Sequence, residues 1–440
     1  MKQHRLCGAP GAGRRLAWLG AGVLLCSSGV VSAATDIQVW HTLSGHNQGV
    51  FEKLVKDFNR SQKDVDVRLK SYDSETAIES ALAGIKKASD RPQLVQLDDD
   101  RTPDEMAKRK DILPMYSLLA KHPIKNAKWF LSEKNTFARD NSGRLVAFPY
   151  MVDVPVMFYN LSSFKKAGLQ STAPSRAWNE LQAQLVTLAN NGSRKCPLTS
   201  DQPVSINLEN LAAVNNQLFV SNSNGLKGKG KPAFSFDVMY IRHLSMMISW
   251  VRSELMVKPE FDQVATKRFA NNECAVLMST SSNLGWFRST RVLDFAVTGL
   301  PYYPQVTSNP GNPFVGGSAL WATSGHAKDS DAASAAFLAW LAQPEQAARW
   351  YQETGYLPLT QQAFQQTDNS YYKNLGDWKN LVAAYEKSPS DSSRGFRIDN
   401  YPRIRAMFRD TLDNALNGKE PAVTALKTAA AQASQLIGAK

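Results

Sequence analysis

Apolar and polar residues alternate along the first half of the chain with two different periods. Short runs with apolar residues on one face indicate strands, and longer stretches with apolar residues three or four positions apart indicate helices. The predicted elements are strands over 36–40, 65–69 and 92–97 and helices over 50–58 and 75–87. This order predicts βαβ units around a mainly parallel sheet.

The ends of these predicted strands are the first candidate site. Ligands of parallel sheets bind beyond the carboxyl ends of the strands. Those positions are Trp40 and His41, the segment 71–75 and the acidic run 98–100. A helix-start signal at 102–105 places the acidic run in the turn between a strand and a helix.

The second half of the chain continues the mixture of strands and helices. Strand patterns cover 152–160, 275–278, 295–298 and 314–322, and helical patterns cover 164–168, 178–190, 235–256, 332–354 and 405–436. A length of 440 residues favours two domains. The sequence contains no low-complexity linker between them, so we expect two lobes joined by several chain crossings.

The N-terminus has the pattern of a secretory signal peptide. Residues 1–15 carry basic but no acidic side chains, residues 16–31 are mostly apolar, and small residues precede a cleavage position after Ala33. The apolar run is shorter than the about 20 residues that span a bilayer. Lipid attachment at Cys26 is disfavoured because the preceding Leu25 is large. We therefore expect export and removal of residues 1–33.

The net charge does not point to a nucleic-acid partner. It is +12, from 51 Lys and Arg against 39 Asp and Glu, but residues 1–33 hold four of the basic residues and none of the acidic ones. The exported chain keeps 47 against 39, a net charge of +8. Its densest basic stretch, Lys227, Lys229 and Lys231, has no aromatic residues for base stacking, so we expect a solvated loop and no nucleic-acid binding.

Metal and cofactor sites are also disfavoured. The six histidines are scattered and form no Cys/His cluster, so we expect neither a metal nor a cofactor. Residues 225–231 fit the spacing of a phosphate-binding loop, but Pro232 replaces the required hydroxyl residue. The exported chain keeps Cys196 and Cys274, which are either a disulfide or two separate buried thiols.

Three carboxylates allow several interpretations. Glu75, Asp99 and Asp153 could supply the acid pair of a glycosidase, accept hydrogen bonds from sugar hydroxyls, or lie in solvated turns. Catalysis is the least favoured of the three. The sequence also lacks the Gly-x-Ser-x-Gly segment of many serine hydrolases.

Aromatic and arginine residues near the C-terminus suggest ligand contacts. Tyr356 directly follows the helix-ending Gly355, which favours a position facing a cleft. Arg403 and Arg405 lie near Tyr401. Arginine suits a phosphate or a carboxylate because it donates two parallel hydrogen bonds to either group.

Several segments together resemble the periplasmic solute-binding proteins of ABC importers, family 1 of the extracellular solute-binding proteins, and above all its glycerol-3-phosphate-binding members. The likeness covers nearly the whole exported chain and lies in the order and spacing of segments. They are 39–41, 155–160, 164–169, 208–210, 316–321, 354–358 and 402–405. Cys196 and Cys274 also fall where that family has cysteines.

The resemblance implies an α/β fold of two lobes, each a mainly parallel sheet flanked by helices, with the ligand cleft at the hinge. It implies that lobe 1 comprises residues 34–152 and 317–376 and that lobe 2 comprises 153–316 and 377–440. It also implies a monomeric periplasmic protein without enzymatic activity, whose partners are a small-molecule ligand and the permease and ATPase subunits of an importer. A ligand that contacts both lobes would shift the hinge equilibrium.

The resemblance further implies a set of ligand-binding residues. Gly317, Tyr356 and Arg405 match the family, Asp99 stands for a Glu, and Thr280 stands for a Ser. Each of these replacements keeps the same chemical group. Arg405, the Gly317 amide and the Thr280 hydroxyl would hold a phosphate.

Four positions depart from the family. Glu75 replaces a Tyr, Asp153 replaces a Ser, and Gln202 and Ser205 stand where two Trp are expected. An ionised Asp153 about 4 Å from a phosphate would repel it by roughly 4 kcal/mol at an effective dielectric of 20. We therefore predict that glycerol-3-phosphate binds weakly or not at all, and that a related phosphodiester, sugar or polyol is preferred.

Two alternative functions use the same residues. One is a sugar-, polyol- or oligosaccharide-binding protein of the same fold that has lost the phosphate site. The other, outside the class, is a secreted carbohydrate-active hydrolase that uses two of the carboxylates.

Overall fold

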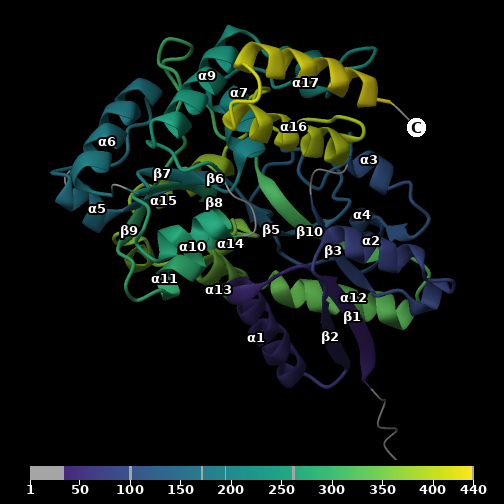
Figure 1. Ribbon diagram of the computed structural model, residues 1–440. Coiled ribbons are helices and arrows are strands. Elements are labelled where there is room, and N and C mark those ends of the chain that lie inside the picture. Colours follow the sequence, from purple (N-terminus) through teal and green to yellow (C-terminus); the bar gives the residue numbers. More distant parts are fainter. Residues whose placement is uncertain (1–33, 99–101, 170–171, 194, 260–262, 439–440) are drawn as a thin grey trace, which may run out of the picture. The chain divides into compact units, whose positions relative to one another are not determined.

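Two β-sheets organise the chain, one in each lobe (Figure 1). The computed structural model describes residues 34–98, 102–169, 172–193, 195–259 and 263–438. The predicted signal peptide, residues 1–33, lies outside the described residues.

The first sheet has the strand order β2-β1-β3-β10-β4, and β5 also pairs with β10. Its strands are β1 (Thr35–His41), β2 (Val65–Ser71), β3 (Leu94–Asp98), β4 (Ile112–Leu113), β5 (Phe148–Asp153) and β10 (Gly316–Thr323). The second sheet has the order β7-β8-β6-β9, with β6 (Pro155–Asn160), β7 (Leu198–Ser200), β8 (Val276–Thr280) and β9 (Phe295–Thr298). The strands predicted over 36–40, 65–69, 92–97, 275–278, 295–298 and 314–322 are confirmed with small shifts at their ends.

Both sheets are mixed, which corrects the prediction of mainly parallel sheets. The β1–β2, β1–β3 and β7–β8 pairs are parallel, as the βαβ pattern predicts. The other pairs, which all involve β10 or β6, are antiparallel. The connectivity accounts for these antiparallel pairs. In chain order, β6 follows β5 of the first sheet and β10 follows β9 of the second sheet, so each strand enters its sheet from the other lobe.

Helices surround both sheets, and their apolar positions explain why they form. In α1 (Gly45–Ser61) the buried side chains are Val50, Phe51, Leu54, Val55 and Phe58, one face of a helix at 3.6-residue spacing. The further helices up to β7 are α2 (Glu75–Ala83), α3 (Pro103–Met106), α4 (Met115–Lys121), α5 (Leu161–Lys166) and α6 (Trp178–Asn191), with the 3₁₀ turn η1 (Ala88–Asp90).

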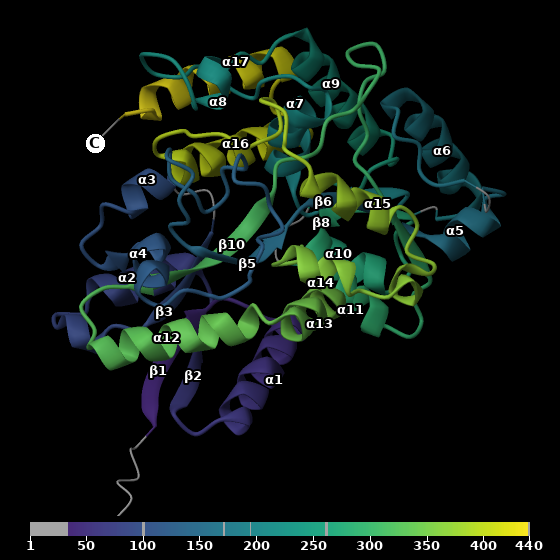
Figure 2. The same ribbon diagram turned by 180° about the vertical axis from the view of Figure 1, so that it is seen from behind.

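The later helices complete both lobes. Between β7 and β10 lie the π-helical turn η2 (Ser205–Glu209), α7 (Asn210–Val214), α8 (Ser221–Asn224), α9 (Val238–Arg252), α10 (Val264–Ala270), η3 (Ser281–Asn283) and α11 (Leu284–Ser289). After β10 come α12 (Lys328–Leu341), α13 (Pro344–Thr354), α14 (Gln361–Gln365), η4 (Asn369–Tyr372), α15 (Trp378–Ala383), η5 (Ala384–Glu386), α16 (Tyr401–Leu416) and α17 (Ala422–Leu436). Both views show α16 and α17 lying beside α9 (Figures 1 and 2).

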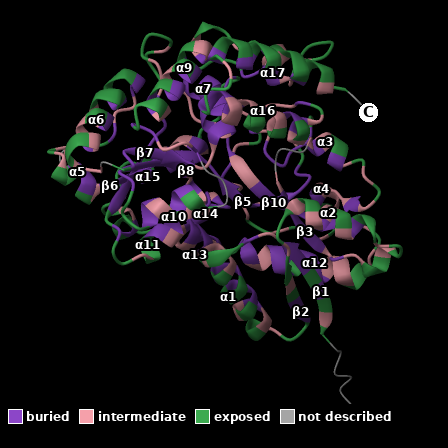
Figure 3. Cartoon of the chain, in the orientation of Figure 1, coloured by how far each residue is buried: buried purple, intermediate pink, exposed green. Residues whose placement is uncertain are grey.

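The buried apolar residues of the described chain form separate clusters, and one of them spans both sheets. The strands are largely buried (Figure 3). One apolar cluster includes Val95 and Trp321 of the first sheet together with Phe158 and Phe295 of the second. Apolar contacts therefore support the region where the lobes meet.

The single strand predicted over 152–160 is wrong in one respect, because the chain changes sheets within it. β5 ends at Asp153, which pairs with Gly316, and β6 begins at Pro155, which pairs with Thr280. Only Val154 separates the two strands. Proline has no N–H to donate, which suits the first position of a strand.

Cys196 and Cys274 form a disulfide with a Cα–Cα distance of 4.5 Å. Both side chains are buried. The Ala275 amide donates to the Cys196 carbonyl oxygen at 2.9 Å, and Leu198 pairs with Val276 directly beyond the bridge. The disulfide therefore joins the segments that lead into β7 and β8.

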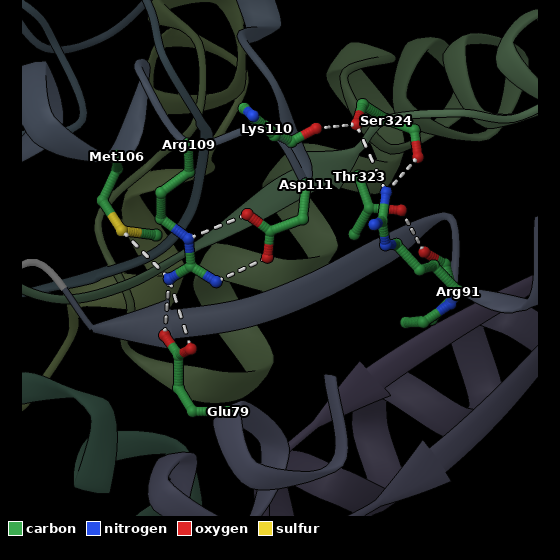
Figure 4. Close-up of polar contacts among 9 residues, drawn as sticks. Glu79, Arg91, Met106, Arg109, Lys110, Asp111, Thr323 and Ser324 are labelled. Atoms are coloured by element: carbon green, nitrogen blue, oxygen red, sulfur yellow. Dashed lines mark hydrogen bonds and ion pairs between the residues drawn. The ribbon is translucent and has the colours of Figure 1, made fainter. Parts of the chain in front are cut away.

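An ion-pair network holds α2 against the loop before β4 (Figure 4). The Arg109 guanidinium donates to Asp111 at 2.6 Å and to Glu79 of α2 at 3.0 Å. Arg109 lowers the pKa of the Asp111 carboxyl, which keeps this acid ionised. Beside it, Arg91 donates to the Ser324 carbonyl oxygen at 3.0 Å. The network fixes the position of α2, the helix that begins with Glu75.

The helices of the described ranges lack the combination of length and apolar character that a bilayer-spanning segment requires.

Candidate ligand-binding site

A cavity of about 290 Å³, which we call the main cavity, lies where strand ends of both sheets meet. Residues of the first sheet line it, and so do residues of the second lobe. The lining residues are Asp98, Asp153, Pro155, Gln202, Ser205, Glu209, Asn210, Thr280, Phe314, Val315, Gly316, Gly317, Phe396, Tyr401 and Arg405.

Asp153 and Thr280 are brought together by the change of sheet at Val154. Asp153 is the last residue of β5, and Thr280 is the last residue of β8 and pairs with Pro155. Ser282 Oγ donates to Asp153 Oδ2 at 2.8 Å and lies 2.6 Å from Thr280 Oγ1. Asp153, Thr280 and Ser282 thus form one hydrogen-bonded group, of which Asp153 and Thr280 line the main cavity.

Gly317 borders the main cavity with a backbone conformation that other residues rarely adopt. Its φ is +95°, and a Cβ at this position would lie 2.2 Å from the Met151 carbonyl oxygen. Met151 belongs to β5, which pairs with β10 here. Glycine is therefore required for the close pairing that brings β10 to the cavity.

Gly317→Ala should lower the free energy of unfolding by about 2 kcal/mol, because it combines a positive φ with a clash against the β5 backbone. Urea unfolding followed by circular dichroism measures this. Gly49→Ala is the matched control: a methyl group at Gly49, in α1, would have nothing within 4 Å, so the helix should gain about 0.5–1 kcal/mol. Equal effects of the two substitutions would contradict the strain at Gly317.

Arg405 is paired with an acid that the sequence patterns did not single out. Arg405 Nε donates to Glu209 Oε1 at 2.9 Å, and the Tyr401 hydroxyl donates to the same oxygen. The Arg405 side chain is 36% exposed and the Glu209 side chain is 8% exposed. Glu209 is buried among apolar neighbours and therefore acts as the counterion of Arg405, while part of the guanidinium remains accessible from the cavity.

Local chain geometry brings Glu209 and Arg405 together. Glu209 ends the π-helical turn η2, a widened helix turn of the kind often found at functional sites. Arg405 lies one turn into α16, four residues after Tyr401. Asn210, the first residue of α7, binds the segment that leads into β10, because its Oδ1 accepts a hydrogen bond from the Phe314 amide at 2.7 Å.

Two buried carboxyls near the cavity hold protons more tightly than usual. Burial raises the pKa of Asp153 to about 6, against the hydrogen bonds from Ser282 and Thr280 and the attraction of Arg405. Burial also raises the pKa of Asp201 to about 7, and the charge of Asp153 adds to this effect. Ser279 Oγ donates to Asp201 Oδ2 at 2.9 Å. These two acids make the charge of the site depend on pH near neutrality.

The other predicted site residues lie around the main cavity in different ways. The Glu75 carboxylate accepts from the Asp98 amide, so Glu75 supports the end of β3 and does not line the main cavity. Asp99 lies outside the described residues. Gln202 and Ser205 line both the main cavity and an adjoining cavity of about 330 Å³.

Tyr356 lies in an aromatic stack and not in the main cavity. It follows Gly355, which ends α13 with a φ of +89°. Its ring stacks on Trp350 at 5.3 Å, and Trp350 stacks on Tyr150 at 4.7 Å. Tyr356 and Thr280 line a further cavity of about 370 Å³, which we call the second cavity.

Sequence reasoning missed Glu209, Asp201 and Ser282. A signal existed for Glu209, which lies between Leu208 and the apolar segment 211–214, because an acid among apolar residues is either paired or costly. Asp201 and Ser282 have no comparable local signal. Within the described ranges no group of three or more His, Cys, Asp or Glu side chains is placed to hold a metal ion.

Comparison with known families gives a match over three quarters of the chain. The sequence model of the bacterial extracellular solute-binding proteins matches residues 53–384. The sn-glycerol-3-phosphate-binding periplasmic protein UgpB of Rhizobium meliloti (strain 1021) is 30% identical over 415 residues, which cover 92% of this chain and 95% of that protein. UgpB of Escherichia coli (strain K12) is 29% identical over 424 residues, 94% of this chain and 95% of that protein.

Solved structures share the fold at lower identity. UgpB from Mycobacterium tuberculosis in complex with glycerophosphocholine superimposes with a TM-score of 0.71 at 17% identity and covers 92% of this chain and 98% of that one. Maltose-bound T. maritima MalE3 gives a TM-score of 0.73 at 17% identity, with 92% and 100% coverage.

Proposed function

Since the chain belongs to the bacterial extracellular solute-binding proteins, we propose that it captures a small solute of the glycerol-3-phosphate or glycerophosphodiester type in the main cavity. It is a periplasmic substrate-binding protein of an ABC importer. Its relatives are binding proteins, and the proposed cycle of capture and release needs no chemical step.

The observation that carries this proposal is the presence of Arg405 in a cavity lined from both sheets. Arg405 offers a partly accessible guanidinium, and Thr280, whose hydroxyl is hydrogen-bonded to Ser282, lies in the same lining. A phosphate oxygen accepts hydrogen bonds from the guanidinium. Asp153 and Asp99 would accept hydrogen bonds from the glycerol hydroxyls, and Glu75 would hold the Asp98 backbone in place.

The Arg405–Glu209 pair sets the affinity for an anion. A ligand phosphate must share the guanidinium with Glu209. The negative charge of Glu209 therefore weakens the attraction between Arg405 and the phosphate. The same pairing orients Arg405 before the ligand arrives, which lowers the entropy cost of binding. A phosphodiester with one negative charge therefore suits this cavity better than a monoester with nearly two.

We assign lobe 1 to residues 34–152 and 317–376 and lobe 2 to residues 153–316 and 377–440. A ligand that contacts Gly317 of lobe 1 and both Asp153 and Arg405 of lobe 2 favours the closed arrangement of the lobes. The closed monomer would then dock on the permease subunits, whose ATPase drives import.

A thermal-shift screen tests the proposed ligand class. Glycerophosphodiesters should raise the melting temperature by several degrees, because a ligand at 100 times its Kd stabilises the folded state by about 2.7 kcal/mol. Glycerol-3-phosphate should give a smaller shift. No shift with any phosphate-containing compound would contradict the proposal, and ligand recovered chemically changed after long incubation would indicate a hydrolase.

Affinity for a glycerophosphodiester should rise about tenfold as the pH falls from about 7.5 to about 5. The raised pKa of Asp153, about 6, means that its carboxyl is ionised at the higher pH and mostly protonated at the lower. The protonated carboxyl no longer repels the phosphate, so anion binding is coupled to proton uptake. A diester does not titrate in this range, and calorimetry at both pH values measures the change.

Asp153→Asn is the matched control for this pH dependence. It keeps the shape of the side chain and removes the charge, so most of the pH dependence should disappear. Arg405 and Asp201 also act on Asp153, and protonation of Asp201, with a pKa of about 7, changes affinity in the same direction. Unchanged affinity of the wild-type protein between the two pH values would show that Asp153 does not face the ligand.

A sugar or polyol ligand without phosphate is the second candidate. Glu209 favours it, because this acid already neutralises Arg405, and buried carboxylates also accept hydrogen bonds from sugar hydroxyls. A thermal shift with maltose or a free polyol, and none with phosphodiesters, would support this alternative.

A further inference from the structure

The second cavity, about 370 Å³ in volume, is lined by two of the predicted ligand-binding residues, Thr280 and Tyr356, but lies outside the proposed phosphate site. It shares Thr280 with the main cavity, so the two adjoin along the Thr280–Ser282 segment. The loop after β1 and the start of α1 form one wall. The turn η3 and the start of α11 form the opposite wall, and α1, α11 and α13 lie close together in Figure 1.

The polar groups of the second cavity are mainly amides and hydroxyls, together with the imidazole of His46, whose Nε2 lies 2.8 Å from the Glu353 carbonyl oxygen. Ser44 and Asn47 come from one wall, and Ser282 and Asn283 come from the other. Asn47 Nδ2 donates to the Ser282 carbonyl oxygen at 3.0 Å. The buried Asn47 Oδ1, beside the Tyr356 phenol, has no hydrogen-bond partner of normal geometry within the described chain.

The composition of the lining indicates what group the cavity can hold. Among the described residues that line it, none is Asp, Glu, Lys or Arg. A cationic group would lack a carboxylate partner, and a second phosphate would lack a Lys or Arg partner among these residues. Trp286 and Tyr356 add flat apolar surface beside the amides. Flat aromatic surface with hydroxyl and amide groups around it suits an uncharged ring that carries several hydroxyls.

We infer that the second cavity binds an uncharged polyhydroxylated ring, a sugar or a cyclitol, esterified to the phosphate that Arg405 holds. The ligand is then a glycerophosphodiester whose second alcohol is a polyol, with its glycerophosphate part in the main cavity. The inference rests on the proposed function, because that function supplies the phosphate position. Thr280, which lines both cavities, marks the point where the ligand passes from one to the other.

Calorimetric titration of the exported chain with three probes tests this inference. Glycerophosphoinositol should bind at least tenfold more tightly than glycerol-3-phosphate, as expected for one or two added hydrogen bonds and ring contact. Glycerophosphocholine, whose alcohol is cationic and has no hydroxyl, should not show this gain over glycerol-3-phosphate. Free inositol, the third probe, shows whether the protein binds the polyol without an attached phosphate.

Two substitutions locate the effect in the second cavity. Ser44→Trp places a large side chain at an exposed position of its lining and should reduce the tenfold affinity ratio to about one. Ser61→Trp, at the exposed far end of α1, is the matched control and should leave the ratio unchanged. Asn283→Ala is a smaller change in the same cavity and should also lower the ratio, which provides a second reading if Ser44→Trp does not fold.

The outcomes distinguish this inference from the proposed function. If glycerol-3-phosphate or glycerophosphocholine binds and glycerophosphoinositol gains nothing, the inference is overturned and the proposed function stands. If the gain exists but Ser44→Trp and Asn283→Ala leave it intact, the ring lies elsewhere and the inference is again overturned. If only free inositol binds and none of the phosphate compounds does, both are overturned.

Discussion

Arg405→Ala is expected to weaken binding of a glycerophosphodiester at least 100-fold. Hydrogen bonds from a charged donor contribute about 1.5–3 kcal/mol each, and a guanidinium offers two to a phosphate. The substitution also leaves Glu209 in the cavity with only the Tyr401 hydroxyl as a described partner, so its negative charge repels the phosphate. Calorimetry with the best-binding diester of the screen measures the loss.

Two variants test whether the position and shape of Arg405 matter. Arg409 lies one turn further along α16, lines the adjoining cavity and contacts Asp410. Arg409→Ala should therefore change the affinity less than threefold. Arg405→Lys keeps the charge but loses the planar pair of donors, so we expect an intermediate loss. An Arg405→Ala variant that retains its affinity within threefold would refute a phosphate site at this residue and favour a neutral sugar ligand.

Removal of the disulfide is expected to lower the free energy of unfolding by about 2–4 kcal/mol. The bridge joins cysteines 78 positions apart, and a closed loop of that length restricts the unfolded chain by about 4 kcal/mol in the entropy treatment. Both sulfur atoms are buried at the entrance to β7 and β8. Urea unfolding of the Cys196→Ala/Cys274→Ala protein measures the difference.

Reduced wild-type protein is the control for this comparison, because it keeps the sulfur atoms and loses only the bond. Its urea midpoint should fall close to that of the double variant and below that of the oxidised protein. Two free thiols in unreduced wild-type protein, or equal midpoints for all three samples, would contradict the bridge. Ligand affinity should change little, since the bridge does not line the main cavity.

Local sequence patterns predicted most of the secondary structure because each element buries a regular set of its own side chains. The five apolar positions of α1 are one example, and the buried strand β8 is another. The pattern failed at 152–160, where apolar residues continue while the chain moves from one sheet to the other. Periodicity reports burial, and it does not report which neighbouring strand provides the hydrogen bonds.

The candidate site was predicted in part, through resemblance as well as chemistry. Asp153, Thr280, Gly317 and Arg405 line one cavity, and Tyr356 lines the next. The charge balance of the main cavity was not predictable from the sequence. The counterion of Arg405 is Glu209, which lies 196 positions earlier in the chain. Likewise, the raised pKa values of Asp153 and Asp201 result from burial between segments that are remote in sequence.

The sequence by itself determined the alternation of strands and helices, the excess of apolar over charged residues and the set of polar groups available for a ligand, because these properties depend only on the order of residues. Only the tertiary structure decided the mixed direction of the strands, the pairing of Cys196 with Cys274, the neutralisation of Arg405 by Glu209 and the presence of a second cavity beside Thr280. Each of these depends on contacts between distant segments, and such contacts form only when both lobes have packed around their common core.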